Sequence, residues 1–324
     1  MKSFFLCLMI ALSLCIVACQ RSPRFRLVKT LNDEASKLVI NNNYAYVIGG
    51  VIPLLDDASS RAVTVWDISN IESPSFIGKL TGFYGYDIQI VGEHALIVDG
   101  SRLQVVDLTD KSAPALVATR TISQGLVMEI AVFEKEAFIL SKDGVSIFDI
   151  TNIESPELSG SLPIKDVWDI EAIAGQVFLL GQELQIYAIN GSGQLELIST
   201  LPLLVGHKEA VGLDNDLLVS ENIVYGTANG LLHIIDISDP KKPFYIASKE
   251  IEETSAWPTG LAKQGQFIFV AAWAGGIVAF DVSNPSDPQQ IATYDDSFIS
   301  RLVVNNTQIF AMGPAAPPLI LELD

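Results

Sequence analysis

The chain has 324 residues, of which 49% are hydrophobic and 18% are charged, and its formal net charge is −18. This apolar content is enough to bury a large core and excludes an intrinsically disordered chain. The excess of carboxylates repels phosphate and anionic headgroups, which argues against nucleic acid and against an anionic lipid surface as partners.

The chain begins with a positively charged Met1-Lys2 pair and an apolar run over residues 4–17, too short to span a bilayer as a mature helix. The run ends in "IVAC", residues 16–19, which resembles the lipobox of bacterial lipoproteins. That resemblance implies cleavage after Ala18, a diacylglycerol thioether on Cys19, and an acyl chain such as palmitate on the new amino terminus. The alternative is an ordinary secretory signal that happens to contain a cysteine.

All three cysteines, Cys7, Cys15 and Cys19, lie in this leader. We therefore expect neither a disulfide framework nor a thiolate metal site in the mature chain. The expected organisation is a lipoprotein signal peptide over residues 1–18, a short tether over 19–24, and a folded domain over 25–324. The lipobox resemblance implies anchoring in the outer membrane, with the domain facing either the periplasm or the cell surface.

The folded part is built from a repeat. The phrase "WDISNIESP" begins at Trp66 and "FDITNIESP" at Phe148, and weaker copies begin at residues 103, 232 and 277. A degenerate copy begins at Leu184, and a truncated one, "LILELD", ends the chain. The seven copies recur at periods of roughly 40 to 50 residues, which is typical of propeller blades.

Each unit predicts four antiparallel strands. Two short apolar stretches joined by a tight turn come first, the phrase itself forms the third strand, and a fourth follows its proline. The aspartate that ends the third strand, Asp67 in the first copy, can accept hydrogen bonds from the N–H groups of the turn. The fourth unit has Ala188 there and lacks the proline, so we expect a looser turn.

Seven such units predict an all-β protein, a seven-bladed β-propeller with four-stranded antiparallel blades. The alternative, an open solenoid, would need polar caps on its end repeats, and none is visible. The last unit stops after its third strand, whereas residues 25–31, "FRLVKTL", match the fourth strands of other units. We therefore expect the N-terminal strand to complete the last blade and close the ring.

The segments "AFILSKDGVSIFDITNIESP" and "FIFVAAWAGGIVAFDVSNPSDP" resemble the LVIVD (LVIVP) repeat family of exported bacterial proteins. The resemblance extends over nearly the whole mature chain and implies a propeller-like fold. It implies no catalytic residues, because the family has no general catalytic motif. A single "VWD" at residues 65–67 resembles a WD40 signature, but no Gly-His pair accompanies it, so that assignment is rejected.

No motif indicates a cofactor or a metal. The three histidines do not share metal-ligand spacing, and the sequence has no phosphate loop, nucleophile elbow or calcium loop.

Aligning the repeats brings aromatic residues to one face of the propeller, where loops enter the innermost strands and where second strands connect to third strands. The candidates for ligand binding on this face are Tyr84, Tyr86, Trp168, Trp257 and Trp273. Two insertions, residues 50–62 and 201–215, fall on the same face. Aromatic residues are enriched at interfaces, although they could also pack locally beneath loops.

The alignment also places one polar residue of each innermost strand at the mouth of the central channel. We expect Asp87, Glu129 and Asp169 to face Lys37 and Arg301 across the ring closure, partly exposed, as further ligand-binding candidates. Asn215 (or Glu209 in its place) and Thr259 complete the ring. The alternative is that the starts of strands are simply polar.

These observations favour a non-enzymatic binding or scaffold lipoprotein at the outer membrane, with an aromatic-rich face for a protein or glycan partner. Two alternatives stay open: a polysaccharide lyase or hydrolase with carboxylates in the channel, and a purely structural component of the envelope.

Overall fold

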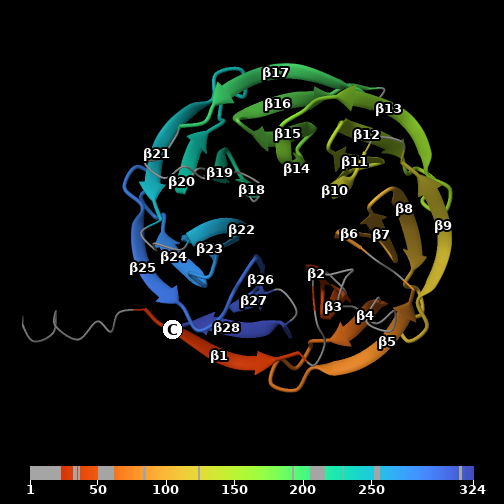
Figure 1. Ribbon diagram of the computed structural model, residues 1–324, viewed down its shortest axis with the longest axis horizontal. Coiled ribbons are helices and arrows are strands. Elements are labelled where there is room, and N and C mark those ends of the chain that lie inside the picture. The colour runs from red at the N-terminus through yellow and green to blue at the C-terminus, as the bar shows by residue number, and fades with distance from the viewer. Residues whose placement is uncertain are drawn as a thin grey trace, which may run out of the picture.

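The computed structural model describes residues 23–31, 35, 37–49, 62–82, 85–122, 125–191, 193–204, 216–228, 230–251, 256–313 and 316–324. In this part of the chain, seven four-stranded antiparallel sheets surround a central axis as the blades of a propeller (Figure 1). The predicted all-β, seven-bladed architecture is confirmed. Among the described residues, no helix is long and apolar enough to cross a membrane.

Within blades 1 to 6 the strands run outward from the axis in chain order. Blade 1 consists of β2 (Lys37–Asn41), β3 (Tyr44–Ile48), β4 (Ala62–Asp67) and β5 (Ser75–Thr81). Blade 2 consists of β6 (Asp87–Val91), β7 (His94–Asp99), β8 (Arg102–Asp107) and β9 (Ala115–Thr121). Blade 3 consists of β10 (Val127–Phe133), β11 (Glu136–Ser141), β12 (Gly144–Asp149) and β13 (Glu157–Pro163).

Blade 4 consists of β14 (Val167–Ile173), β15 (Gln176–Gly181), β16 (Glu183–Ile189) and β17 (Leu195–Pro202). Blade 5 consists of β18 (Asp216–Ser220), β19 (Ile223–Ala228), β20 (Leu231–Asp236) and β21 (Phe244–Glu250). Blade 6 consists of β22 (Ala256–Gln264), β23 (Phe267–Trp273), β24 (Ile277–Asp281) and β25 (Gln289–Tyr294). Blade 7 consists of β26 (Arg301–Asn305), β27 (Gln308–Met312), β28 (Leu319–Leu323) and β1 (Phe25–Thr30).

The hydrophobic core lies between the blades. Each of the seven buried apolar clusters combines side chains of two neighbouring blades. In one of them, Leu96 and Val105 of blade 2 pack with Ile130, Ile139 and Phe148 of blade 3. The middle strands are therefore apolar on both faces, which explains why the third-strand phrase reads as an almost unbroken apolar run.

In five of the blades an aspartate at the end of the third strand closes the following turn. Asp67, Asp107 and Asp236 each accept, through Oδ1, a hydrogen bond of 2.8 Å from the backbone N–H two residues later. The prediction for this position is therefore confirmed. In blade 4, where Ala188 replaces the aspartate, the predicted looser turn is wrong. Asn190 closes it by accepting a hydrogen bond of 3.0 Å from the N–H of Gln194.

These turns also join neighbouring blades on the outside of the propeller. The turn of blade 2 lies against Gly78 of β5, where an added Cβ atom would come within 2.3 Å of the carbonyl oxygen of Lys111. Arg120 of β9 donates to the carbonyl of Pro156 (2.8 Å), and Ser199 of β17 donates to that of Pro240 (2.6 Å). The repeated nine-residue phrase thus supplies a strand and also the contact that holds the preceding blade.

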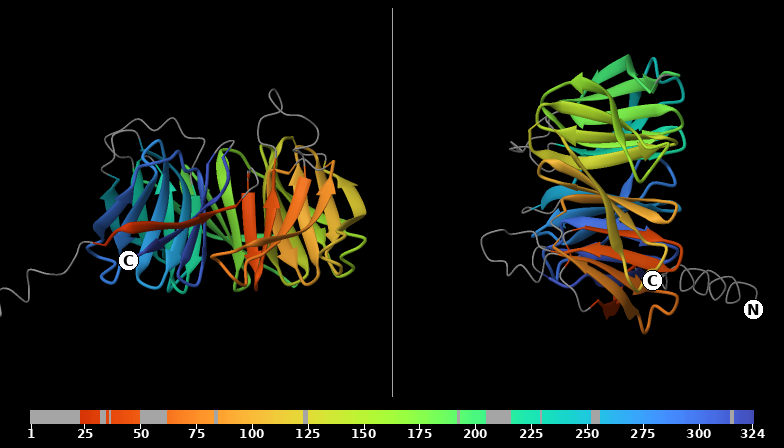
Figure 2. Two further views of the ribbon diagram at one scale, coloured as in Figure 1. Left: turned by 90° about the horizontal axis from the view of Figure 1, so that it is seen from below. Right: turned by 90° about the vertical axis from the view of Figure 1, so that its right-hand side faces the viewer.

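The N-terminal strand completes blade 7 as predicted. β1 runs antiparallel to β28, with Phe25 opposite Leu323 and Thr30 opposite Leu319. It runs along the outer surface of the ring (Figure 2). The ring of Phe25 reaches the neighbouring blade 6, where it lies edge-on to Phe269 (6.0 Å between centroids) and Tyr294 (6.1 Å). β1 therefore supplies the outer edge of one blade and part of the seam with another.

Two alanine substitutions on β1 test this closure. We expect Phe25→Ala to lower the free energy of unfolding by about 2 kcal/mol, because it removes an aromatic ring from the seam between blades 6 and 7. Leu27→Ala, on the same strand but 50% exposed, should change it by about 0.5 kcal/mol or less. Urea denaturation of both variants gives the comparison. Equal stabilities of the two variants would contradict this role of β1.

Candidate functional site

The innermost strands of all seven blades start at the same end of the central channel, here called the mouth. The ring residues at the mouth are defined as Lys37, Asp87, Glu129, Asp169, Asp216, Thr259 and Arg301. All of these residues except Thr259 line a cavity of about 220 Å³ in the channel. Glu171, which lies deeper in β14, lines the same cavity. The structure therefore brings together all five of the predicted charged candidates.

The sequence prediction was wrong in blade 5 and incomplete in blade 4. Asn215 and Glu209 lie outside the described residues, and Asp216, the next residue, holds the ring position as the first residue of β18. A long insertion precedes this strand, so the repeat alignment had no nearby anchor. Glu171 was missed because only one position per strand was considered. It follows Asp169 by two residues and faces the same way, as alternation along a strand requires.

The expectation that the ring side chains are partly exposed is also wrong for several of them. Asp87 is 1% exposed and Asp169 is 4% exposed, and Thr259 is buried as well. These side chains turn sideways toward the next blade instead of pointing outward. Thr259 donates to the carbonyl of Ser300 in blade 7 at 2.8 Å, and it does not line the cavity.

Three of the carboxylates connect their blade to the next one. Asp87 of blade 2 accepts a hydrogen bond of 3.0 Å from the N–H of Ile130 in blade 3. Asp169 of blade 4 accepts from the N–H of Leu217 in blade 5, and Asp216 accepts from that of Leu261 in blade 6. A carboxylate with a backbone donor in a buried site makes a strong hydrogen bond. The ring residues therefore fasten the inner edges of the blades.

Lys37 extends this network across three blades. Its Nζ atom lies 2.9 Å from Oδ1 of Asp87 and 3.3 Å from Oε1 of Glu129. Burial lowers the pKa of Lys37, but the two carboxylates outweigh burial and raise it above its ordinary value. The ammonium group therefore stays charged and neutralises part of the acid cluster.

Three further carboxyl groups share the interior of the channel. Burial raises the pKa of Asp169 well above its ordinary value, and the nearby Glu129 carboxylate adds to the effect. Burial also raises the pKa of Asp216. For Glu129, burial is outweighed by a hydrogen bond from Asp169 and by the charges of Lys37 and Arg301, so that its pKa falls. The pKa values of the neighbouring Asp169 and Glu129 therefore move in opposite directions.

Aromatic side chains surround the same mouth. Trp168 immediately precedes Asp169 in β14, and Trp273 ends β23 opposite Ala256 at the start of β22. Both are partly exposed, and Trp273 lies edge-on to the exposed ring of Phe298 at 6.4 Å. The two tryptophans therefore share one face, as the repeat alignment predicted.

Tyr86 is also at the mouth, where it lies beside Leu126: both side chains come within 3.9 Å of where a Cβ atom at Gly100 would stand. Trp257 belongs to β22, but its side chain, Tyr84, and Cys19 lie outside the described residues, as do most of the two insertions. The mouth face thus presents Tyr86, Leu126, Trp168, Trp273 and Phe298 around a charged channel.

A model of the LVIVD repeat matches residues 84–121, 124–163, 212–248 and 259–296. The chain carries LVIVD repeats. The four matches correspond to blades 2, 3, 5 and 6, which hold the copies of the phrase that begin at residues 103, 148, 232 and 277. The resemblance found in the sequence is confirmed, and one LVIVD repeat corresponds to one blade.

Solved structures confirm the fold over the whole domain. The WD40 propeller domain of Doa1 shares 14% identity with a TM-score of 0.66, covering 92% of this chain and 96% of that one. BamB from Moraxella catarrhalis shares 11% identity (TM-score 0.63; 92% and 99% covered), and a chain of the Mitotic Checkpoint Complex shares 12% (TM-score 0.68; 94% and 93%). No curated protein matches the sequence.

The buried acids predict a pH dependence of stability. Burial raises the pKa of Glu171 to about 7 in the folded protein. The folded state therefore binds more protons than the unfolded state above pH ~4.5, and stability falls as the pH rises through 7. Between pH 5 and pH 8 we expect the free energy of unfolding to drop by about 2 kcal/mol more for the wild type than for Glu171→Gln.

Urea denaturation at the two pH values measures this difference. The exposed Glu196→Gln in β17 serves as the control and should leave the wild-type pH dependence intact. If Glu171→Gln and Glu196→Gln show the same change with pH, the assignment of a neutral Glu171 is wrong.

Proposed function

We propose that this protein is a non-enzymatic binding scaffold whose mouth face holds a protein partner. The observation that supports this most is the group of exposed apolar side chains beside the channel. Phe298 is 58% exposed, and Leu126 and Tyr86 are exposed as well. Exposed aromatic and aliphatic side chains gathered on one face are typical of interaction surfaces.

Five other exposed apolar residues of the propeller have a different explanation. Leu27, Phe76, Leu116, Leu158 and Leu197 all occupy the same position in their blades, at the bulge where the outermost strand pairs with the third. They are spread around the rim, one in each of five blades, and follow from the repeat. The exposed residues at the mouth do not recur from blade to blade, so the repeat does not account for them.

A protein partner fits this surface better than a glycan. Tryptophan rings stack on sugars, but the aliphatic side chain of Leu126 beside Tyr86 has no such role and is suited to a hydrophobic protein contact. The similarity of the fold to a chain of the Mitotic Checkpoint Complex, a multiprotein assembly by its name, supports a partner of this class.

The channel gives little support to a lyase or hydrolase. Its cavity of about 220 Å³ is smaller than the roughly 300–1,000 Å³ of ordinary ligand pockets, and a sugar polymer would not enter it. The carboxylates that could act as acid and base already hold the backbone N–H groups of the next blade. These carboxylates therefore hold neighbouring blades together and are not free to act on a substrate.

We propose further that Cys19 is lipidated and anchors the domain to the outer membrane. The geometry supports the orientation that this anchor would impose. Phe25, six residues after Cys19, pairs with Leu323 at the end of the third strand, which is the end of the propeller opposite the mouth. An anchor attached there leaves the mouth face directed away from the bilayer and accessible to a partner.

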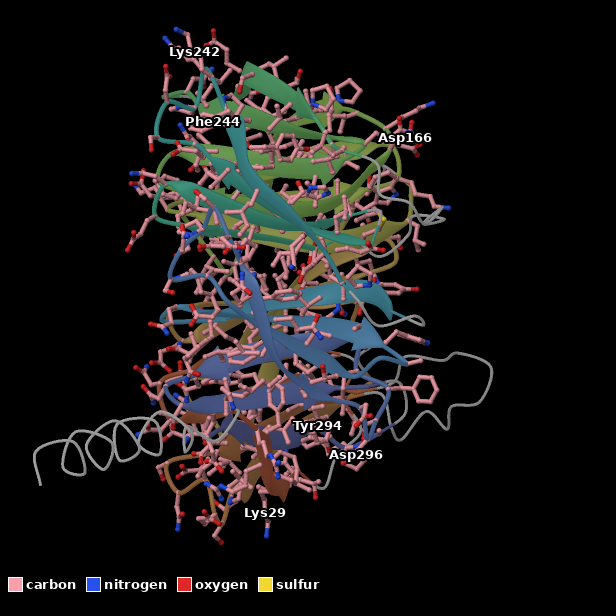
Figure 3. The ribbon with its side chains drawn as sticks, turned by 90° about the vertical axis from the view of Figure 1, so that its left-hand side faces the viewer. Lys29, Asp166, Lys242, Phe244, Tyr294 and Asp296 are labelled. Atoms are coloured by element: carbon pink, nitrogen blue, oxygen red, sulfur yellow. The ribbon has the colours of Figure 1, made fainter. Side chains whose placement is uncertain are left out.

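Photocrosslinking at matched positions tests the proposed surface. Phe298 at the mouth and Phe244 on the opposite rim are the same residue type and almost equally exposed, at 58% and 55%. Figure 3 shows Phe244 on one side of the propeller, and Asp166 and Asp296, which flank the mouth, on the other. A photoreactive residue at position 298 should give protease-sensitive adducts in cells, and one at 244 should give none.

The outcome also separates the partner classes. An adduct from position 298 that resists protease but is shortened by glycosidase would mean that the partner is a glycan. Adducts from position 244 alone would mean that the partner binds the face opposite the mouth, which contradicts the proposal. Once a protein partner is purified, Phe298→Ala should weaken the complex about tenfold, as truncation of a central aromatic contact does.

The anchor has its own test. Cys19→Ser removes the thiol that the lipid would occupy, so the protein should move from the membrane fraction to the soluble fraction after cell lysis. Cys15→Ser, within the same leader, should leave the membrane fraction unchanged. If the Cys19→Ser protein still sediments with membranes, lipidation is not the anchor.

A further inference from the structure

Arg301 differs from the other charged residues of the channel. It is the first residue of β26, and it lines the cavity opposite the acid cluster. Lys37 pairs directly with two carboxylates, but Arg301 makes no hydrogen bond and no ion pair within 4 Å to any residue that the structure describes. Its side chain is partly buried, and it belongs to the lining of the cavity.

A partly buried guanidinium that has no partner among the described residues is costly. Arginine is almost always ionised, and its five donors normally find carboxylates or carbonyls when they are removed from bulk water. The carboxylates of Glu129, Asp216, Asp87 and Asp169 act on Arg301 through their charges but do not contact it. The cavity therefore lies between a group of carboxyls and a guanidinium that pairs with none of the described residues.

We propose that this cavity binds a small zwitterion of the free α-amino acid type. The carboxylate of the ligand would pair with the fork of donors on Arg301, and its ammonium group would face the carboxyls of Asp169 and Asp216. A space of about 220 Å³ holds about seven non-hydrogen atoms if each takes about the 30 Å³ share of a water molecule. Alanine and serine are of that size.

Other ligand classes fit the cavity less well. A simple anion would meet Arg301 but also the acid cluster around it. A metal ion would need three or more ligands in a suitable arrangement, and no such group of His, Cys, Asp or Glu exists among the described residues. A zwitterion carries one charge for Arg301 and the opposite charge for the carboxyls. Val303 and Met312 add apolar atoms to the lining, which suit a small aliphatic side chain.

Proton uptake in the channel gives the proposal a second observable. The charged and titratable groups that face the cavity are Lys37, Asp87, Glu129, Asp169, Glu171, Asp216 and Arg301. Burial keeps Asp169 and Asp216 protonated above their ordinary range. An ammonium group placed beside them favours their ionised forms, so binding should release protons to the solvent.

This site is independent of the proposed partner surface. It rests on a guanidinium in the channel that pairs with none of the described residues, whereas the partner surface rests on apolar side chains around the mouth. Either proposal can fail without the other.

Calorimetric titration of the folded domain tests the site with four probes: L-alanine, L-serine, acetate and methylammonium. We expect saturable binding of at least one of the two amino acids, and at least tenfold weaker binding of acetate and methylammonium, which each carry only one of the two charges. No saturable binding of either amino acid would overturn the proposal. Acetate or methylammonium binding as tightly as the amino acid would overturn it too.

Variants identify the cavity as the binding site. Arg301→Gln should weaken amino acid binding by roughly 10- to 100-fold, the usual cost of losing a charge-assisted pair. Arg301→Lys, which keeps the charge but loses the fork, should fall between this variant and the wild type. Lys142→Gln removes an exposed cation on the same face and should bind like the wild type. Equal affinities of Arg301→Gln and Lys142→Gln would place the site elsewhere.

Proton release is measured by repeating the wild-type titration at pH 6 in two buffers of different ionisation enthalpy. A difference in the apparent binding enthalpy that corresponds to released protons supports contact of the ammonium group with the carboxyls. Identical enthalpies in the two buffers would overturn that part of the geometry. Thermal melts of each variant, recorded beside the titrations, separate loss of binding from loss of the fold.

Discussion

A single blade of this protein cannot bury its own hydrophobic surface, and the rest of the structure follows from that constraint. The middle strands are apolar on both faces, and each of the seven core clusters is shared by two blades. Stability therefore resides in the seams between blades. A ring of seams has no free end, which is why the chain uses its first strand to complete its last blade.

The seams are fastened by different chemistry at different depths. Apolar side chains fill the middle of all seven, whereas in several seams the turn of one blade sits on the outer strand of the preceding blade and ring residues fasten the inner edge. Gly78 shows the tight fit at the outside, and Asp87 accepting from Ile130 shows the polar contact at the inside. The nine-residue phrase recurs because one short stretch supplies a strand, its turn and an outer contact, and blade 4, which departs from it, closes its turn through Asn190 instead.

The sequence was sufficient for the fold, because repeat period, turn chemistry and the missing last strand are local or recurrent signals. The sequence predicted the residues and the side-chain exposure of the channel less completely. Alignment brought Lys37, Asp87, Glu129, Asp169 and Arg301 together, but it gave Asn215 where the structure has Asp216, since an insertion interrupts the repeat just before β18. It also suggested exposed side chains, because the sideways hydrogen bonds to the next blade have no signature in the order of residues.

The residues that break the repeat are the most informative about function. An acid at the start of an innermost strand is explained by its hydrogen bond to the next blade, as in blades 2, 4 and 5. Lys37 and Arg301 depart from this pattern in blades 1 and 7, which are neighbours across the ring closure, so the positive charge gathers on one side of the channel. Lys37 pairs with Asp87 and Glu129. Arg301 acts on the carboxylates only through its charge and makes no hydrogen bond or ion pair with any residue that the structure describes, so its donors face the cavity and point to a ligand.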